Sequence, residues 1–364
     1  RTLTRAVTDQ GAGQVTWPDV LSALVAGRDL RSDEATWAMD QIFSGEATPS
    51  QVGGFLIGLR AKGETVEEMH ALADVMLSHS HRLPTPPKSI DIVGTGGDRA
   101  HTVNISTMSA LVLAGGGLRV LKHGNRAASS SSGSADVLEA LGLDLSLTPE
   151  RVQAVGDEAG ITFCFAQAFH PAMRYAAPTR RELGIGTVFN NLGPLTNPGQ
   201  PTYAAVGVAD ARLAALMAGV FAARERPAVV FRGADGLDEL ALAGPSQVWW
   251  VADGVVSEHV IGPQDVGLMI APLEALRGGD PAHNAGVVRE LLAGRGRDES
   301  WAPRDAVLFN AGAAFAVASG EVCGSPVTGA VVAAIRSGIE QARESLDSGA
   351  AAAALDRWIA ATRA

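Results

Sequence analysis

The stretch "DIVGTGGDRAHTVNIST" at residues 91–107 decides how the rest of the sequence is interpreted. A short apolar run leads into Gly94, Gly96 and Gly97, and a helical pattern follows the stretch. Glycine allows the backbone to turn tightly and to approach a ligand without interference from a Cβ atom. Successive exposed amides in such a loop form a binding site for an anion. The order strand, glycine loop, helix therefore predicts an α/β fold with an anion site, although the glycines alone also fit a plain turn.

The segment "NIST" at residues 104–107 stands at the predicted start of that helix. A helix N-terminus offers unpaired amides and the positive end of the helix dipole. Asn104 or Ser106 can cap the helix, and the hydroxyls of Ser106 and Thr107 can bind phosphate oxygens or a metal ion. Capping and ligand binding are compatible, so both interpretations stay open.

A second loop, "KHGNRAASS" at residues 122–130, follows another strand-like run. Lys122 and Arg126 carry charge, the serines provide hydrogen bonds, and Gly124 permits the bend. A solvated serine-rich loop is the alternative. The position of these residues directly after a strand favours a second anion-binding loop.

An acidic turn, "GADGLDEL" at residues 233–240, follows a further strand-like run. It carries Asp235, Asp238 and Glu239. Mg²⁺ prefers such oxygen ligands and typically takes one or two carboxylates together with substrate phosphates. Beside two phosphate loops, the turn therefore predicts a metal site that neutralises a polyphosphate.

The bulk composition limits the possible classes of protein. A chain of 364 residues with 46% hydrophobic residues can form two domains, or one α/β domain with an added piece. The net charge of −10 argues against nucleic-acid binding as the main role. Cys164 and Cys323 lack metal-site spacing and fit a reducing cytoplasm. The chain opens without Met and without a secretory pattern, and its longest uncharged run, 102–118, indicates a buried helix and not a membrane span.

Two domains are expected along the chain. Residues 1–85 have helical patterns and form a small all-α domain, which helices from about 148–184 are expected to join. Residues 86–147 and 185–364 alternate strand-like and helical runs and form a large α/β domain. Such alternation predicts a central, mostly parallel sheet flanked by helices.

Taken together, these motifs resemble the anthranilate phosphoribosyltransferase family, whose members act in tryptophan synthesis. The resemblance covers nearly the whole chain and follows the family's order of motifs, which are "GTGGD", "NIST", "KHGNRAASS" with "SGSADVLEALG", "HPAMRYAAPTRRELG", "FNNLGPLTNP" and "DGLDE". One departure is Gly186, where many relatives have Arg.

The resemblance implies transfer of the phosphoribosyl group of phosphoribosyl pyrophosphate to anthranilate. It implies Mg²⁺, two ions per subunit, a homodimer in the cytoplasm, and neither nucleic acid nor membrane as a partner. The implied phosphoribosyl pyrophosphate residues are Gly94, Gly97, Asp98, Thr102, Asn104, Ile105, Ser106, Thr107, Lys122, His123, Gly124, Asn125, Arg126, Ala127, Ala128, Ser129, Ser130 and Ser134. The implied anthranilate residues are Gly94, Asn125 and Arg180, and the implied metal ligands are Ser106, Asp238 and Glu239.

Arg180 and the histidines need separate consideration. "PTRRELG" is also typical of an exposed helical charge cluster. However, a planar guanidinium binds a carboxylate such as that of anthranilate with two hydrogen bonds. Because the amine of anthranilate is neutral at pH 7, we expect no residue to act as acid, base or nucleophile. His123 and His170 are therefore not assigned a catalytic role, and His123 is expected only to line the phosphoribosyl loop.

Two other functions are compatible with a fold of this kind. A pyrimidine nucleoside phosphorylase would need inorganic phosphate but no acidic metal pair, so "DGLDE" and "KHGNR" argue against it. A non-enzymatic DNA-binding paralogue would carry basic surfaces, which the net charge of −10 disfavours.

Overall fold

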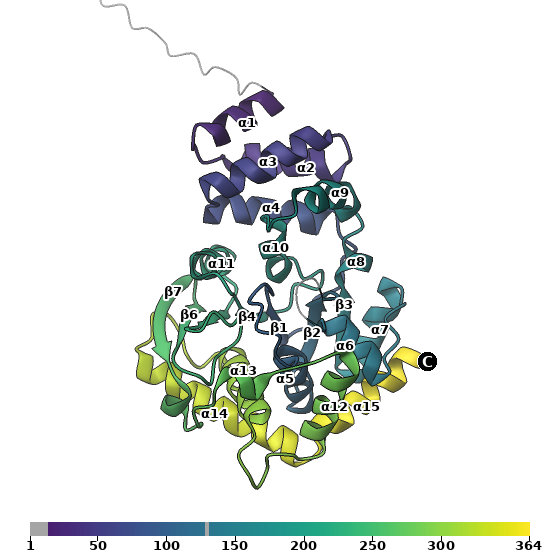
Figure 1. The fold of residues 1–364 in the computed structure, drawn as a ribbon, viewed down its shortest axis with the longest axis vertical. Coiled ribbons are helices and arrows are strands. Elements are labelled where there is room, and N and C mark those ends of the chain that lie inside the picture. Colours follow the sequence, from purple (N-terminus) through teal and green to yellow (C-terminus); the bar gives the residue numbers. More distant parts are fainter. Residues whose placement is uncertain (1–13, 128–130) are drawn as a thin grey trace, which may run out of the picture.

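The computed structural model describes residues 14–127 and 131–364, which form a helical part and an α/β part (Figure 1). The helical part consists of four N-terminal helices and one helix from much later in the chain, which packs against α2 and α3. These helices are α1 (Trp17–Val25), α2 (Ser32–Phe43), α3 (Pro49–Lys62), α4 (Val66–Ser78) and α9 (Met173–Leu183). None of the helices in the described ranges is long and apolar enough to cross a membrane.

Capping explains where two of these helices begin. The Thr65 side chain accepts a hydrogen bond from the Glu68 amide, and the Glu68 carboxylate accepts one from the Thr65 amide. Thr48 and Gln51 form the same reciprocal pair at the start of α3, where Pro49 occupies the first helical position. Each pair satisfies two backbone donors that a helix start leaves without partners.

The described residues of the α/β part contain a seven-stranded sheet with the order β3-β2-β1-β4-β5-β6-β7. Its strands are β1 (Ser89–Gly94), β2 (Arg119–Gly124), β3 (Ile161–Phe165), β4 (Tyr203–Gly207), β5 (Ala228–Gly233), β6 (Ser246–Ala252) and β7 (Val255–Ile261). The first five strands pair in parallel, and the last two pair antiparallel. The predicted fold class, helices beside a mostly parallel α/β sheet, is therefore confirmed.

The strand order creates a topological switch point. The chain builds outward from β1 to β2 and β3, and it then returns to place β4 on the other side of β1. In open α/β sheets, ligands bind outside the carboxyl ends of the strands at such a point. The topology alone therefore predicts a ligand site at the loops that follow β1 and β4.

Helices cover both faces of the sheet, and alternating strand residues point to the two sides. Ala205 and Val229 face a core formed with α5 and α13, whereas Val206 and Val230 face a core shared with α11 and the helical part. The helices that follow the N-terminal four, apart from α9, are α5 (Ile105–Gly115), α6 (Ser134–Leu141), α7 (Pro149–Ala159), α8 (Ala166–Phe169), α10 (Phe189–Leu192), α11 (Ala211–Ala223), α12 (Pro281–Leu292), α13 (Ala302–Ser319), α14 (Thr328–Asp347) and α15 (Ala350–Arg363). Three short 3₁₀ helices are η1 (Gly193–Leu195), η2 (Pro263–Val266) and η3 (Leu273–Leu276).

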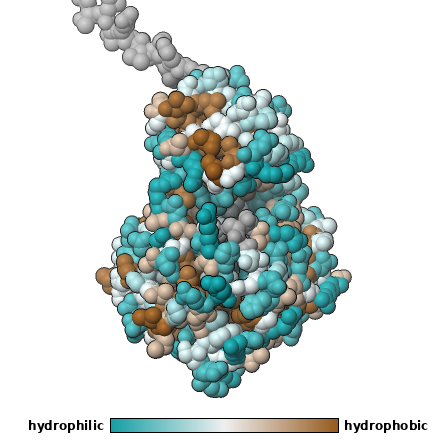
Figure 2. Space-filling model, viewed as in Figure 1, coloured by the Kyte–Doolittle hydropathy of each residue, from teal (hydrophilic) through white to brown (hydrophobic). Residues whose placement is uncertain are grey.

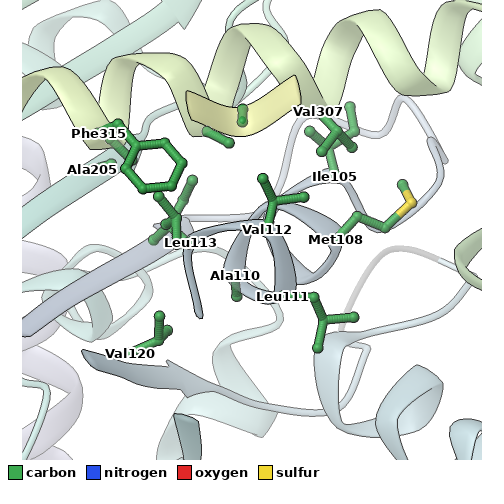
Figure 3. Packing of buried hydrophobic residues seen from close by; sticks show 14 of the residues in the cluster. Ile105, Met108, Ala110, Leu111, Val112, Leu113, Val120, Ala205, Val307 and Phe315 are labelled. Carbon is green, nitrogen blue, oxygen red and sulfur yellow. The ribbon is translucent and has the colours of Figure 1, made fainter. Parts of the chain in front are cut away.

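Helix α5 lies in the middle of the larger core (Figure 3). Nine of its eleven residues are buried, as expected for a helix that is enclosed on all sides. Figure 3 shows Val112 and Leu113 of α5 on the side of Phe315 and Val307, which belong to α13. Because α5 cannot shift without disturbing this packing, the position of its N-terminus is fixed.

One expectation about the domains is wrong in part. Residues 149–165 were expected among the helices that join the helical part, but α7 packs against β3 and α15, and "ITFCF" is the edge strand β3. A parallel neighbour of β2 requires a crossover helix that lies on the sheet, and α7 has that position. Helix α9, from the later half of 148–184, does pack on the helical part.

Two ion pairs connect the helical part to α11 of the α/β part. Arg212 Nη2 lies 2.5 Å from Glu64 Oε2, just before α4, and Arg224 Nη2 lies 2.5 Å from Asp74 Oδ1 within α4. The pairs lie near opposite ends of α11, so they fix the direction of α4 across this face of the sheet.

Candidate active site

The carboxyl ends of β1 and β4 meet the acidic turn. Gly94 ends β1 and Gly207 ends β4, and a Cβ atom on either glycine would overlap with Asp238. The amide of Gly96 donates a 2.7 Å hydrogen bond to Asp238 Oδ2. Glycine is required at these two strand ends because the turn approaches so closely. The structure thus brings together the first loop and the acidic turn, which are 142 residues apart.

Asp238 and Glu239 are buried acids in this junction, with 9% and 7% of their surface exposed. Burial raises the pKa of Asp238 to about 7, and the neighbouring Asp98 adds to the effect. Burial also raises the pKa of Glu239 well above its usual range, and the charge of Asp238 contributes. Lys122 and the amide of Ser106 act in the opposite direction on Glu239. The site is therefore short of positive charge, which a divalent cation would supply.

The donor set fits a magnesium ion that arrives with its substrate. Among residues 14–127 and 131–364, no group of three or more His, Cys, Asp or Glu side chains is placed to hold a metal ion by itself. Mg²⁺ does not need such a cage, since it keeps several waters and binds one or two carboxylates plus substrate phosphates. Asp238, Glu239 and the hydroxyl of Ser106 offer oxygen atoms that could serve as ligands of this kind.

Lys122 lies beneath the loops and not on their surface. It belongs to β2, is fully buried, and its Nζ donates to Ile92 O at 2.7 Å and to Ser106 Oγ at 3.2 Å. Burial lowers the pKa of Lys122, whereas the Asp91 and Glu239 carboxylates raise it. Its ammonium group therefore holds the Ser106 hydroxyl and partly balances the acids from below.

The N-terminus of α5 connects the first loop to the last part of the second loop, which we extend here past residue 130 to the start of α6 at Ser134. Asn104 Nδ2 donates to Ser132 O at 3.0 Å, and Thr107 Oγ1 donates to Ser134 Oγ at 3.2 Å. The Ile105 side chain is part of the core, and its amide donates to Val103 O. Neither the side chain nor the amide of Ile105 is therefore free to bind a phosphate.

The second loop is held by Asp136, near the start of α6. The amides of Ala127 and Gly133 both donate to Asp136 Oδ2 at 2.9 Å. The guanidinium of Arg126 lies 3.2 Å from Asp136 Oδ1 and 2.6 Å from Glu139 Oε2, so its charge is already paired. Asn125 is exposed and Gly124 is half-buried. Three predicted residues lie outside the described part of the chain, namely Ala128, Ser129 and Ser130.

The other residues of the first loop that were predicted to bind the substrate have different surroundings. Gly97 has a φ of +88°, which only glycine adopts easily, and open space surrounds the position of its missing Cβ. Asp98 Oδ1 accepts a hydrogen bond from the Ala100 amide. Thr102 pairs with Arg277, which directly follows η3, in an isolated β-bridge.

His123 and His170 form a buried pair with ring centroids 5.2 Å apart. Burial lowers the pKa of His123 to about 4 and that of His170 to about 3. His123 Nδ1 lies 3.0 Å from Gly193 O, which ties the end of β2 to η1. Both rings are therefore neutral at pH 7, and the absence of an acid or base role for them stays a prediction.

Arg180 lies on α9, on the side of the helical part. Its guanidinium lies over the Phe189 ring, 5.2 Å from the ring centroid, and Nη2 lies 3.4 Å from Asn190 Oδ1. Burial lowers its pKa, and no carboxylate of the described residues forms an ion pair with it. A half-buried guanidinium without a partner charge is suited to a carboxylate ligand.

Two buried asparagines support the site, and sequence reasoning missed both. Asn310 of α13 accepts from the Leu240 amide and donates to Leu240 O, beside Glu239. Asn284 of α12 donates to Asn104 Oδ1 at 2.8 Å. For Asn310, the signal in the sequence was an amide inside the otherwise apolar run 306–317, because buried amides are retained where they have hydrogen-bond partners.

Comparisons with known proteins agree with this geometry. Residues 18–80 match the helical bundle domain of a glycosyl transferase family, and residues 86–352 match its α/β domain. The chain is 60% identical to the anthranilate phosphoribosyltransferase of Nocardioides sp. over 95% of this chain and 99% of that protein. The crystal structure of the Thermus thermophilus enzyme of that name is 42% identical, with a TM-score of 0.86 over 95% of this chain and 100% of that chain.

The enzyme of the same name from Saccharomyces cerevisiae is more distant in sequence. Its structure with phosphoribosyl pyrophosphate and Mg is 28% identical and has a TM-score of 0.84 over 95% of this chain and 98% of that chain. Its structure with 4-fluoroanthranilate is 26% identical and has a TM-score of 0.82 over the same shares.

Proposed function

This chain belongs to the anthranilate phosphoribosyltransferase family, and from that membership we propose that it transfers the phosphoribosyl group of 5-phosphoribosyl 1-pyrophosphate to the amine of anthranilate. The products are N-(5-phosphoribosyl)anthranilate and pyrophosphate, and the reaction is the second step from chorismate to L-tryptophan. The observation that carries the proposal is the junction of both anion loops with Asp238 and Glu239 at the switch point of the sheet.

The pyrophosphate end of the substrate lies at this junction. Asp238, Glu239 and Ser106 would hold Mg²⁺, which neutralises the negative charge that develops on the leaving pyrophosphate. Amides of the first loop other than that of Gly96 bind its oxygens, and Lys122 fixes the Ser106 hydroxyl from below. These groups favour cleavage of the bond between ribose C1 and the pyrophosphate oxygen because their positions are set before the substrate arrives.

Anthranilate approaches from the opposite side of the ribose. Arg180 binds its carboxylate, and Asn125 at the end of β2 contacts it from the second loop. The neutral amine attacks ribose C1 as pyrophosphate leaves, so the chain supplies position and not a base. Binding of 4-fluoroanthranilate by the yeast enzyme supports a carboxylate-reading site in this family.

Further features of the assembly are part of the proposal. Two Mg²⁺ ions per subunit fit a pyrophosphate substrate, and the yeast structure with phosphoribosyl pyrophosphate and Mg supports metal binding. A homodimer through the helical part is supported by exposed Val25 (87%) and Ile57 (38%), and Figure 2 shows hydrophobic surface gathered on that part. Cys164 and Cys323 are both free thiols, which supports a cytoplasmic location.

Anthranilate fluorescence provides the test. With both phosphoribosyl pyrophosphate and Mg²⁺ present, we expect the signal to fall with time, and we expect no change when either is omitted. Release of a free base from a pyrimidine nucleoside in the presence of inorganic phosphate, without loss of anthranilate signal, would instead identify a nucleoside phosphorylase.

A further inference from the structure

The first substrate loop rests on a segment that is far away in the sequence. We call residues 276–284, "LRGGDPAHN", the backing segment. The amide of Val103 donates to Leu276 O at 2.9 Å, and the amide of Gly278 donates to His101 O at 2.8 Å. These bonds flank the isolated β-bridge between Thr102 and Arg277. The backing segment and the first loop therefore pair side by side, as two antiparallel strands do in a sheet.

Gly278 shows how close this approach is. A Cβ atom at this position would lie 2.6 Å from Thr102 O and 2.9 Å from Asn284 Oδ1. Neither neighbour is the free end of a flexible surface chain, so no larger residue fits without moving the loop. The backing segment is thus built to approach the loop backbone directly.

Asn284 lies at the centre of a directed chain of hydrogen bonds. It is 1% exposed, and its Oδ1 accepts from the Gly279 amide at 2.9 Å. Its Nδ2 donates to Asn104 Oδ1 at 2.8 Å, and Asn104 Nδ2 then donates to Ser132 O at 3.0 Å. A carboxamide has one acceptor end and one donor end, so Asn284 determines which way Asn104 points.

The consequence concerns both substrate loops. If the Asn104 amide turned over, its NH₂ group would face that of Asn284, and its oxygen would face Ser132 O. Both contacts would then be repulsive. The correct orientation of Asn104 therefore ties the start of α5 to the second loop.

We propose that Asn284 is a positioning residue for phosphoribosyl pyrophosphate, which sets the Asn104 carboxamide and thereby holds the two substrate loops in register. This inference rests on the proposed function, because phosphoribosyl pyrophosphate is the ligand of those loops. Asn284 does not touch the substrate, and it acts through Asn104.

Asn284→Asp tests the inference with the smallest change. Aspartate keeps the shape and the acceptor for the Gly279 amide, and it removes the N–H group that faces Asn104. In calorimetric titrations with Mg²⁺ present, we expect binding of phosphoribosyl pyrophosphate to weaken about tenfold. The KM for anthranilate at saturating phosphoribosyl pyrophosphate should change less than about twofold. If the Asp variant does not fold, Asn284→Ser takes its place in the same titration.

A double-mutant cycle separates positioning from general support of the fold. If Asn284 acts through Asn104, Asn104→Ala combined with Asn284→Ala should bind no more weakly than Asn104→Ala alone. Ser345→Ala is the matched control, because it removes a buried 2.7 Å hydrogen bond to Val112 O of the same helix α5, near its other end. It should leave phosphoribosyl pyrophosphate binding unchanged.

The outcomes are distinguishable. If the parent protein does not bind phosphoribosyl pyrophosphate, the proposed function fails. If the parent binds but Asn284→Asp binds equally well, or if the two alanine substitutions weaken binding additively, the role assigned to Asn284 is wrong.

Discussion

The two substrates are expected to meet very different surroundings in this molecule. In the pyrophosphate region, formed by the first loop and the acidic turn, Asp238 and Glu239 are buried, and Asp238 lies against the backbone at the ends of two strands. The anthranilate region depends on Arg180 from α9, whose guanidinium contacts one ring and one amide oxygen. The first is part of the α/β core, and the second is a single charged group on the helical part.

This difference follows from what each region must stabilise. Charge develops on pyrophosphate during the reaction, so its ligands must be fixed in advance in a site with little water. Anthranilate keeps its charge, so one guanidinium is sufficient to orient it. Changes in the acidic turn should therefore affect the chemical step, and changes at Arg180 should affect one substrate only.

The largest effect is expected from Asp238→Asn combined with Glu239→Gln. The double change keeps volume and removes the charges that would bind Mg²⁺, so kcat/KM should fall by about a thousandfold or more. The fold should remain, since the parent buries these acids at a cost. Asp235→Asn, on the exposed side of the same turn, is the control and should retain activity. Near-normal turnover of the folded double variant would disprove the metal assignment.

A smaller and selective effect is expected at Arg180. Arg180→Ala removes a charge-assisted contact worth roughly 1.5–3 kcal/mol, so kcat/KM for anthranilate should fall by about ten- to a hundredfold. Arg181→Ala removes the exposed neighbouring charge and should change nothing. Steady-state kinetics with anthranilate as the varied substrate decide the matter, and equal effects of the two substitutions would contradict the role of Arg180.

The buried acids also predict how stability depends on pH. Because the pKa of Asp238 is raised to about 7, the folded protein keeps a proton that the unfolded chain loses near pH 4. This contribution is fully present below pH 4 and is lost as the pH rises through about 7. In calorimetry without Mg²⁺, Tm should therefore fall more between pH 5 and pH 8 for the parent than for Asp238→Asn. Identical pH slopes for both proteins would show that Asp238 has an ordinary pKa.

The smallest effect is expected where the second loop meets α6. Arg126 is paired with Glu139, whose side chain is 40% exposed, and phosphoribosyl pyrophosphate would have to compete for that charge. An exposed ion pair contributes roughly 0.2–1 kcal/mol, so Glu139→Gln should tighten phosphoribosyl pyrophosphate binding by at most about fivefold. Calorimetry measures this directly, and weaker binding would mean that the ion pair holds Arg126 in its productive position.

The sequence revealed the residues that stand at strand ends and helix starts. "GTGGD" and "DGLDE" both follow apolar strands, so their position at one edge of a parallel sheet could be predicted, and the family prediction is confirmed. The binding roles of these residues stay predictions. The burial of Lys122 was not predicted, because a lysine at the end of a strand is usually solvated and its partners lie on β1 and α5.

Long-range support could not be predicted from local patterns. The bond from Asn284 to Asn104 joins residues 180 apart, and those from Asn310 to Leu240 join residues 70 apart. Strand β3 was missed because "ITFCF" is too short for periodicity to separate it from a helix segment. In each case tertiary packing, and not local propensity, determines the hydrogen-bond partner or the secondary structure.

The most direct test compares the two regions in one experiment. Phosphoribosyl pyrophosphate is titrated with Mg²⁺ into two folded variants, Arg180→Ala and the double variant Asp238→Asn, Glu239→Gln, and the heat of binding is measured for each. We predict parent-like binding by Arg180→Ala and no measurable Mg²⁺-dependent binding by the double variant. Weakened binding by Arg180→Ala, or retained Mg²⁺-dependent binding by the double variant, would contradict the assignment of the two substrates to these two regions.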